Sequence, residues 1–135
     1  HKGMSVVIFD KRELGGVCLN EGCIPTKTLL YSAKLYDHAR EGKKYGILAS
    51  DVTMDFAAVM KRKNKIVRKL VGGVGAKMKK YKVEVVKEAA VIRGNEKGVI
   101  TIESNNTEYQ AKNLLISTGS EAFVPPIPGR QQRGI

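Results

Sequence analysis

The sequence contains no tryptophan, only three phenylalanines and only two histidines in 135 residues. Even with five tyrosines the aromatic content is only 6%, so stacking platforms for single-stranded nucleic acids are not evident. No apolar run approaches the roughly 18 residues that a membrane-spanning helix needs, and the N-terminal stretch lacks a signal-peptide core. We therefore expect a cytoplasmic protein without a membrane segment. With 42% hydrophobic residues, the chain can build the core of one globular domain.

Cysteine is also scarce, and the two cysteines lie close together in GGVCLNEGCIPTK (15–27), at Cys18 and Cys23. Closing so small a ring would stabilise the fold by only roughly 2 kcal/mol, so structural stapling is a weak reason for the pair. A zinc site would need two further ligands, and His1 and His38 are poorly placed to supply them, so we expect no metal. Two explanations stay open: a pair of buried, inert cysteines, or thiol–disulfide exchange.

The surroundings of the second cysteine favour exchange. If a helix begins near Cys23, its unpaired N–H groups lower the pKa of that thiol into a range of roughly 3.5 to 7.5. Pro25 is tolerated in the first turn of such a helix, where its N–H would have no partner. Lys27 follows one turn later on the same face and adds a positive charge. Gly22 has no Cβ, which would let a planar group approach the sulfur.

The order of predicted elements indicates an α/β fold. SVVIFD (5–10) is typical of a buried parallel strand, and it ends in an acid, Asp10. Four short runs follow at 82–88, 89–93, 98–104 and 107–111, separated by the turn formers GNEKG and SNN. In chain order we predict a strand over 5–10, a helix over 23–40, a longer helix over 55–81, a β-meander over 82–111 and a buried strand over 112–118.

Asp10 suggests a nucleotide cofactor. An acid at this place in a doubly wound sheet commonly binds ribose hydroxyls, about 20 residues after a glycine-rich phosphate loop. Only nine residues precede Asp10, so that loop cannot fit in this sequence. VGGVGAKMKK (71–80) does not replace it, because Met78 stands where the motif needs glycine, and we interpret it as a loosened helix end. We expect an incomplete doubly wound domain whose first strand and phosphate loop are missing.

Positive charge is in excess, with 24 Lys and Arg against 13 Asp and Glu and a net charge of +11. Much of the excess lies in 61–69 and 77–82, between apolar residues that recur at helical spacing. Such a pattern is typical of the solvated side of an amphipathic helix. A basic nucleic-acid-binding module with an incidental disulfide is therefore the less favoured alternative.

GGVCLNEGCIPTK resembles the flavoprotein disulfide reductases, and most closely their dihydrolipoamide dehydrogenase branch. Glutathione and mercuric reductases look similar here, but they usually carry valine variants of the loop, whereas this chain has Leu19, Asn20 and Ile24. The resemblance continues through VVIFDK, VGGVGAKMKKYKVEVV and LLISTGSEAFVPPIPG, and it therefore covers nearly the whole chain.

The resemblance implies a role for each matching residue. Cys18 would match the interchange thiol that reacts with the substrate sulfur, and Cys23 the sulfur whose thiolate forms a charge-transfer contact with the flavin. Lys27 would match the lysine beside the flavin's reactive nitrogen. Asp10 stands where the family usually has Glu, which binds the adenosine ribose. The other implied FAD contacts are Lys11, Gly15, Gly16, Thr26, Lys27, Thr118 and Gly119.

The implied reaction is oxidation of dihydrolipoamide to lipoamide through a Cys18–Cys23 disulfide and FAD, with NAD as the final acceptor. The implied partners are the lipoyl groups of 2-oxo acid dehydrogenase complex subunits, and the full-length parent would be a homodimer. We expect residues 1–135 to be an internal piece of the FAD-binding domain, without the NAD and dimerisation domains and inactive alone. A flavin reductase of the glutathione or mercuric type is an alternative. Such a piece could also borrow strands from a second copy of itself.

Overall fold

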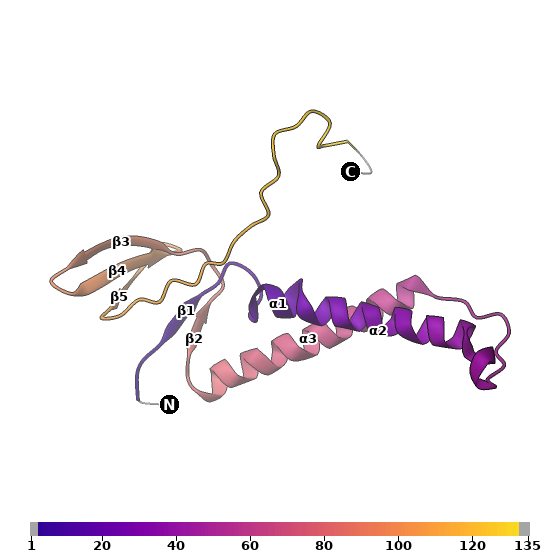
Figure 1. Cartoon of the computed structure of the whole chain (residues 1–135). Helices are drawn as coiled ribbons and strands as arrows, with labels where there is room; N and C mark the ends of the chain where they lie inside the picture. Colours follow the sequence, from indigo (N-terminus) through magenta and orange to yellow (C-terminus); the bar gives the residue numbers. More distant parts are fainter. Residues whose placement is uncertain (1–2, 133–135) are drawn as a thin grey trace.

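The computed structural model describes residues 3–132, which form two separate sheets and a long pair of helices (Figure 1). The elements, in chain order, are β1 (Val7–Phe9), α1 (Gly16–Asn20), α2 (Cys23–Arg40), the 3₁₀ helix η1 (Gly42–Tyr45), α3 (Phe56–Lys80), β2 (Glu84–Val86), β3 (Val91–Glu96), β4 (Val99–Ser104) and β5 (Thr107–Ala111). This mixture of strands and helices confirms the predicted α/β class.

The first sheet is a parallel pair of β1 and β2. Two further hydrogen bonds extend the pairing, because Glu84 N–H donates to Val6 O and Asp10 N–H donates to Val86 O, each at 3.0 Å. A parallel pair needs a long crossover connection, and here the crossover contains α2 and α3. The assignment of 82–88 to the meander is therefore wrong, because β2 pairs with β1. The residues of β1 are half-buried, although a buried strand is expected.

The helices α2 and α3 pack side by side (Figure 1). Each begins and ends within one residue of the range that the sequence predicts. Asp55 caps α3, since its Oδ1 accepts a hydrogen bond from Ala58 N–H at 3.0 Å. Arg62 of α3 donates from Nη1 to the Thr28 carbonyl at 3.4 Å and lies 5.8 Å from the centre of the Tyr31 ring. No helix within residues 3–132 is long and apolar enough to cross a membrane.

The glycine-rich stretch of α3 does not loosen the helix. Gly72, Gly73 and Gly75 all lie inside α3, which continues to Lys80. A glycine in a helix costs about 1 kcal/mol relative to alanine, but the helix continues through all three, and Val74 between them is half-buried. The expected loosened helix end is thus wrong. A Cβ added at any of these glycines would meet no atom within 4 Å.

The second sheet is antiparallel, with strand order β3, β4, β5. Its central strand contains Ile102, a core residue that is only 3% exposed. Ser104 is buried beside it and donates from Oγ to the Ala89 carbonyl at 2.8 Å. The rings of Phe9 and Tyr109 meet edge to face with centroids 5.0 Å apart, and this contact joins the second sheet to the first.

The turns of this sheet are tighter than the sequence pattern suggests. β3 continues through Gly94 to Glu96, so most of GNEKG lies in a strand. The reversal uses Lys97 and Gly98, both with positive φ (51° and 83°). Positive φ at both central residues is the hairpin turn that matches the twist of the strands. The meander therefore has three strands within 91–111.

The segment after β5 does not form the expected strand. Residues 113–120 have no regular secondary structure, although a buried strand is predicted over 112–118. Leu115 is 88% exposed and Ile116 is 64% exposed. A strand exists only when a neighbour supplies its hydrogen-bond partners, and no described strand lies along this segment. The chain here runs from β5 back toward the ends of β1 and β2, and only the part that follows extends away from both sheets (Figure 1).

Candidate redox site

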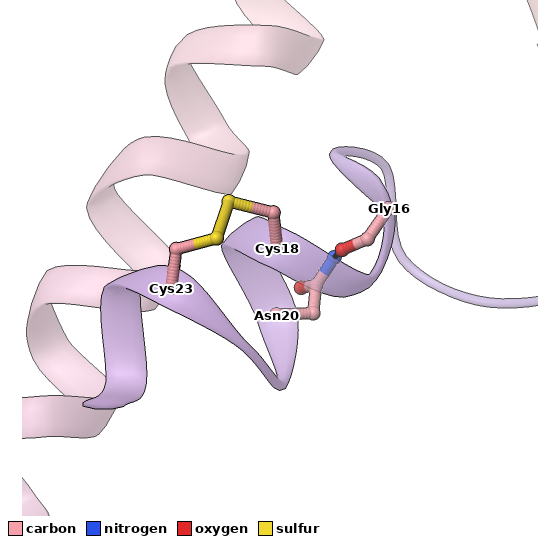
Figure 2. Close-up of a disulfide and its surroundings, with 4 residues drawn as sticks. All are labelled: Gly16, Cys18, Asn20 and Cys23. Atoms are coloured by element: carbon pink, nitrogen blue, oxygen red, sulfur yellow. Dashed lines mark hydrogen bonds between the residues drawn. A yellow bond between two sulfur atoms is a disulfide. The ribbon is translucent and has the colours of Figure 1, made fainter. Parts of the chain in front are cut away.

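The two cysteines lie where α1 meets α2, and they form a disulfide (Figure 2). Cys18 belongs to α1, Cys23 is the first residue of α2, and their Cα atoms are 4.7 Å apart. Both residues are exposed. This finding contradicts the interpretation of two buried, inert cysteines, because a thiol in solution has access to the pair.

A close backbone approach brings the two helices together. The N–H groups of Glu21 and Gly22 both donate to the Val17 carbonyl, at 2.8 and 2.7 Å. A Cβ on Gly22 would lie 3.2 Å from Cys18 Cα and 3.2 Å from the Val17 oxygen. Glycine is therefore needed here because the backbone of α1 crowds it. The sequence suggests a different reason, the approach of a planar group to the sulfur.

Cys23 occupies the positive end of α2. Its N-cap, Gly22, has no side chain to accept from the first N–H groups of the helix. The ladder starts with Thr26 N–H, which donates to Gly22 O at 3.0 Å. Lys27 is exposed and stands one turn after Cys23. When the disulfide opens, the helix end and this cation both favour a negative charge on the Cys23 sulfur.

Asp10 lies at the carboxyl end of β1 and is half-buried. Its Oδ1 accepts a hydrogen bond from Arg12 N–H at 2.9 Å, which folds the chain back after the strand. Lys87, just after β2, reaches the same loop and donates from Nζ to both Glu13 carboxylate oxygens at 3.1 Å. The loop between β1 and α1 is thus tied to both strands of the first sheet.

The C-terminal segment returns to this loop through Glu121. Its carboxylate lies 3.6 Å from Arg12 Nη2 and 3.9 Å from Lys11 Nζ. Arg12 also contacts Glu21, between the cysteines, with Nη1 and Oε1 3.4 Å apart. Thr118 and Gly119 stand three and two residues before Glu121. These ion pairs bring the 118–121 loop to the carboxyl end of β1.

The predicted residues therefore fall into two neighbouring groups. One is the disulfide with Thr26 and Lys27 at the start of α2. The other surrounds the end of β1, where Lys11 and the 118–121 loop meet. Gly15 and Gly16 connect the two groups and have φ values of 112° and 66°. The sequence predicts neither the short helix α1 nor these ion pairs, because the pairs join residues far apart in the chain.

Two shallow hollows lie elsewhere. The first, of about 220 Å³, is lined by apolar side chains of α2 and α3 and by Met54, and the second, of about 420 Å³, is formed by residues 127–132. Neither includes a predicted site residue. Within residues 3–132, no three His, Cys, Asp or Glu side chains are grouped so that they could hold a metal ion. His1 lies outside the described residues.

Known proteins that resemble this chain include a dihydrolipoyl dehydrogenase and a flavoprotein disulfide reductase. The chain is 44% identical over 125 residues to a dihydrolipoyl dehydrogenase of Geobacillus stearothermophilus, a match that covers 92% of this chain and 26% of the relative. In structure it matches the flavoprotein disulfide reductase RclA from Escherichia coli, in its Cu(II) complex, with a TM-score of 0.72 and 27% identity, over 94% of this chain and 25% of that protein.

A second solved structure supports the fold alone. LpdA from Mycobacterium tuberculosis matches with a TM-score of 0.81 but only 17% identity, over 93% of this chain and 28% of that one. The chain therefore spans about a quarter of the length of these relatives. Its sequence also matches the pyridine nucleotide-disulphide oxidoreductase model over residues 1–135. On this evidence of sequence, fold and cysteine geometry, the chain belongs to the pyridine nucleotide-disulphide oxidoreductase family.

Proposed function

We propose that the full-length parent of this chain oxidises dihydrolipoamide to lipoamide, with FAD as its bound cofactor and NAD as the final electron acceptor. The observation that supports this most directly is the exposed Cys18–Cys23 disulfide at the start of α2, within a sequence 44% identical to a dihydrolipoyl dehydrogenase. The lipoyl groups of 2-oxo acid dehydrogenase subunits are the proposed partners. We further propose a cytoplasmic homodimer.

The disulfide accepts the substrate's electrons in two exchange steps. One substrate thiolate attacks the Cys18 sulfur, forms a mixed disulfide and breaks the bond to Cys23, which leaves as a thiolate. The second substrate thiol then loses its proton. The resulting thiolate attacks the first substrate sulfur, which is bonded to Cys18 in the mixed disulfide. This step closes the lipoamide ring and releases the Cys18 thiolate. Two electrons and two protons have left the substrate: the cysteine pair holds the electrons, and the protons have passed to the solvent.

The choice of Cys18 as the attacked sulfur follows from the leaving group. Exchange is faster when the departing sulfur is the more stable anion. Cys23 stands at the positive end of an 18-residue helix with Lys27 one turn away, whereas α1 spans five residues. Attack on Cys18 therefore expels the better-stabilised thiolate.

The residues present fit FAD. Asp10 is half-buried at the carboxyl end of β1, and its Oδ2 has no hydrogen-bond partner within residues 3–132, so it can accept from a ribose hydroxyl. Lys11, the next residue, would contact FAD at the same end of β1. The remaining proposed contacts are Gly15, Gly16, Thr26, Lys27, Thr118 and Gly119. When bound, FAD supplies the two-electron acceptor between the cysteine pair and NAD.

One experiment separates this function from its closest relatives. The full-length protein, purified with FAD, is assayed for reduction of NAD by dihydrolipoamide, and in parallel for NADPH-dependent reduction of glutathione disulfide and of Hg²⁺. We expect turnover only in the first assay, and its loss in Cys18→Ser. Turnover with glutathione disulfide or Hg²⁺ but none with dihydrolipoamide would replace the proposal by the glutathione or mercuric type.

The nucleic-acid alternative has its own test. The helix α3 contains nine Lys and Arg and no Asp or Glu, so an electrostatic contribution to polyanion binding is expected at low salt. Filter binding of a labelled duplex and a single strand to the 135-residue chain measures it. We propose that no binding persists near 150 mM salt. Retention that weakens with salt and ignores Cys18→Ser would favour a basic binding module.

A further inference from the structure

Asn20 holds together the turn that leads into α1. Its Nδ2 group donates to three backbone carbonyls, those of Glu13 and Leu14 at 3.2 Å each and that of Gly16 at 3.0 Å. Figure 2 shows its side chain reaching back from the end of α1 to the Gly16 carbonyl, beside Cys18. Asn20 itself is half-buried. The two N–H bonds of one amide are therefore shared among three backbone acceptors, two in the loop and one in the first turn of α1.

The turn needs such a donor. Gly15 and Gly16 both have positive φ, a backbone conformation that favours glycine. α1 has five residues, no side-chain N-cap and no buried residue. A helix this short is unstable by itself, since nucleation is unfavourable. The amide of Asn20 and the disulfide thus hold α1 in place together with the Glu21 and Gly22 N–H groups, which donate to the Val17 carbonyl.

We propose that Asn20 is a positioning residue for the redox pair: its amide keeps Cys18 within reach of Cys23 after the disulfide has opened. The inference rests on the proposed function for its place in the reaction, but the contacts that support it do not. In the reduced protein the covalent tie is gone, and the three hydrogen bonds remain to restrict where the Cys18 sulfur can move. When the motion of the Cys18 sulfur is restricted, its effective concentration at Cys23 is high, and this favours re-formation of the disulfide.

The effect is measurable as an equilibrium with glutathione. The 135-residue chain is equilibrated in mixtures of reduced and oxidised glutathione, quenched with acid, alkylated and weighed by mass spectrometry. Asn20→Asp keeps the shape of the side chain but places a carboxylate against three carbonyl oxygens. Asn20→Ala removes the group. We expect the effective concentration of the pair to fall about tenfold in each variant, which raises the reduction potential by about 30 mV.

A matched control tests whether the effect depends on where the Asn→Asp substitution is made. Asn64 is exposed on α3, so Asn64→Asp makes the same substitution away from the redox pair. We expect its equilibrium to stay within twofold of the unchanged chain. Far-UV circular dichroism checks that α2 and α3, which contain most of the helical residues, remain folded in every variant. A uniform shift in all three variants, Asn64→Asp included, would overturn the proposal.

Two further results would also overturn it. The first is an equilibrium constant within twofold of the unchanged chain in both Asn20 variants. The second is loss of the α2 and α3 signal in both variants, because the proposed role is local to α1. Glutathione is the only reagent, so a failure of dihydrolipoamide to reduce the parent would leave this comparison intact. If the parent oxidises dihydrolipoamide normally but the Asn20 variants leave the glutathione equilibrium unchanged, only the proposed role of Asn20 is wrong.

Discussion

The carboxylate of Glu121 lies 3.6 Å from Arg12 Nη2, and this pair joins the C-terminal segment to the loop after β1. Arg12 also contacts Glu21 between the two cysteines. One guanidinium thus stands between the 118–121 loop and the redox pair. Because the segment after β5 pairs with no described strand, these ion pairs are its principal polar ties to the first sheet.

We predict that Glu121→Gln releases this segment without unfolding the rest. The Arg12 and Glu121 side chains are 58% and 74% exposed, and ion pairs this exposed contribute little to global stability. Chymotrypsin cleavage after Phe123, followed by mass spectrometry, should become about two- to fivefold faster in Glu121→Gln. Salt near 1 M should accelerate cleavage of the unchanged chain toward the same rate. Glu96→Gln on β3 is the control, and equal acceleration in both variants would contradict the prediction.

A second prediction concerns glycine at two different places. Gly22→Ala puts a Cβ 3.2 Å from the backbone of α1, and the crowding should destabilise the junction by about 1–3 kcal/mol. Gly72→Ala on α3 meets no atom within 4 Å and should stabilise the helix by about 1 kcal/mol. Urea unfolding with the disulfide intact measures both. Opposite signs are expected, and a stabilising Gly22→Ala would show that the close approach is absent.

The long helices could be predicted from sequence because their signals are local. Asp55 marks the start of α3, and Cys23 with Pro25 marks the start of α2. The parallel pairing of β2 could not be predicted, since the pattern at 82–88 is the same whether a strand joins a meander or a distant strand. The same limit explains the wrong strand prediction over 112–118. Its apolar residues resemble a strand, but the pattern does not show which other strand would pair with it.

The site shows a similar division. The cysteine pair, Lys27 and Asp10 are recognisable because residue type and spacing carry the chemistry. In the sequence Asn20 marks only the family branch, because its contacts with three backbone carbonyls appear only once the chain has folded. A double glycine followed by a carboxamide four residues later is the only local signal that could have indicated this role.

A third prediction concerns the antiparallel sheet at low pH. Arg93 Nε donates to Glu103 Oε2 at 2.8 Å, and this hydrogen bond, with the charge of the guanidinium, lowers the pKa of Glu103 from its ordinary value of 4.5. A carboxyl whose pKa is lower in the folded chain stabilises it above pH 4.5 and loses that contribution as the pH falls through the folded pKa. Urea unfolding of the unchanged chain and of Glu103→Gln at several pH values measures the contribution.

We expect a small difference in unfolding free energy between the unchanged chain and Glu103→Gln, because the Arg93 and Glu103 side chains are exposed. This difference should be constant from pH 6 to 7. It should shrink below about pH 4.5 and vanish when Glu103 is protonated in both states. Glu108→Gln on the neighbouring strand β5 is the control for charge removal. A difference that grows as the pH falls would mean that Arg93 does not stabilise the carboxylate.

The last prediction assigns different roles to the two sulfurs. In the full-length parent loaded with FAD, addition of two electrons should give a long-wavelength absorption band, because a thiolate at the positive end of α2 would lie against the oxidised flavin. Cys18→Ser should show the band even without reduction, since its Cys23 cannot form the disulfide. Cys23→Ser should never show it. The visible spectrum during anaerobic titration with dithionite gives the answer, and a band that survives in Cys23→Ser would transfer the flavin contact to Cys18 and reverse the order of exchange proposed above.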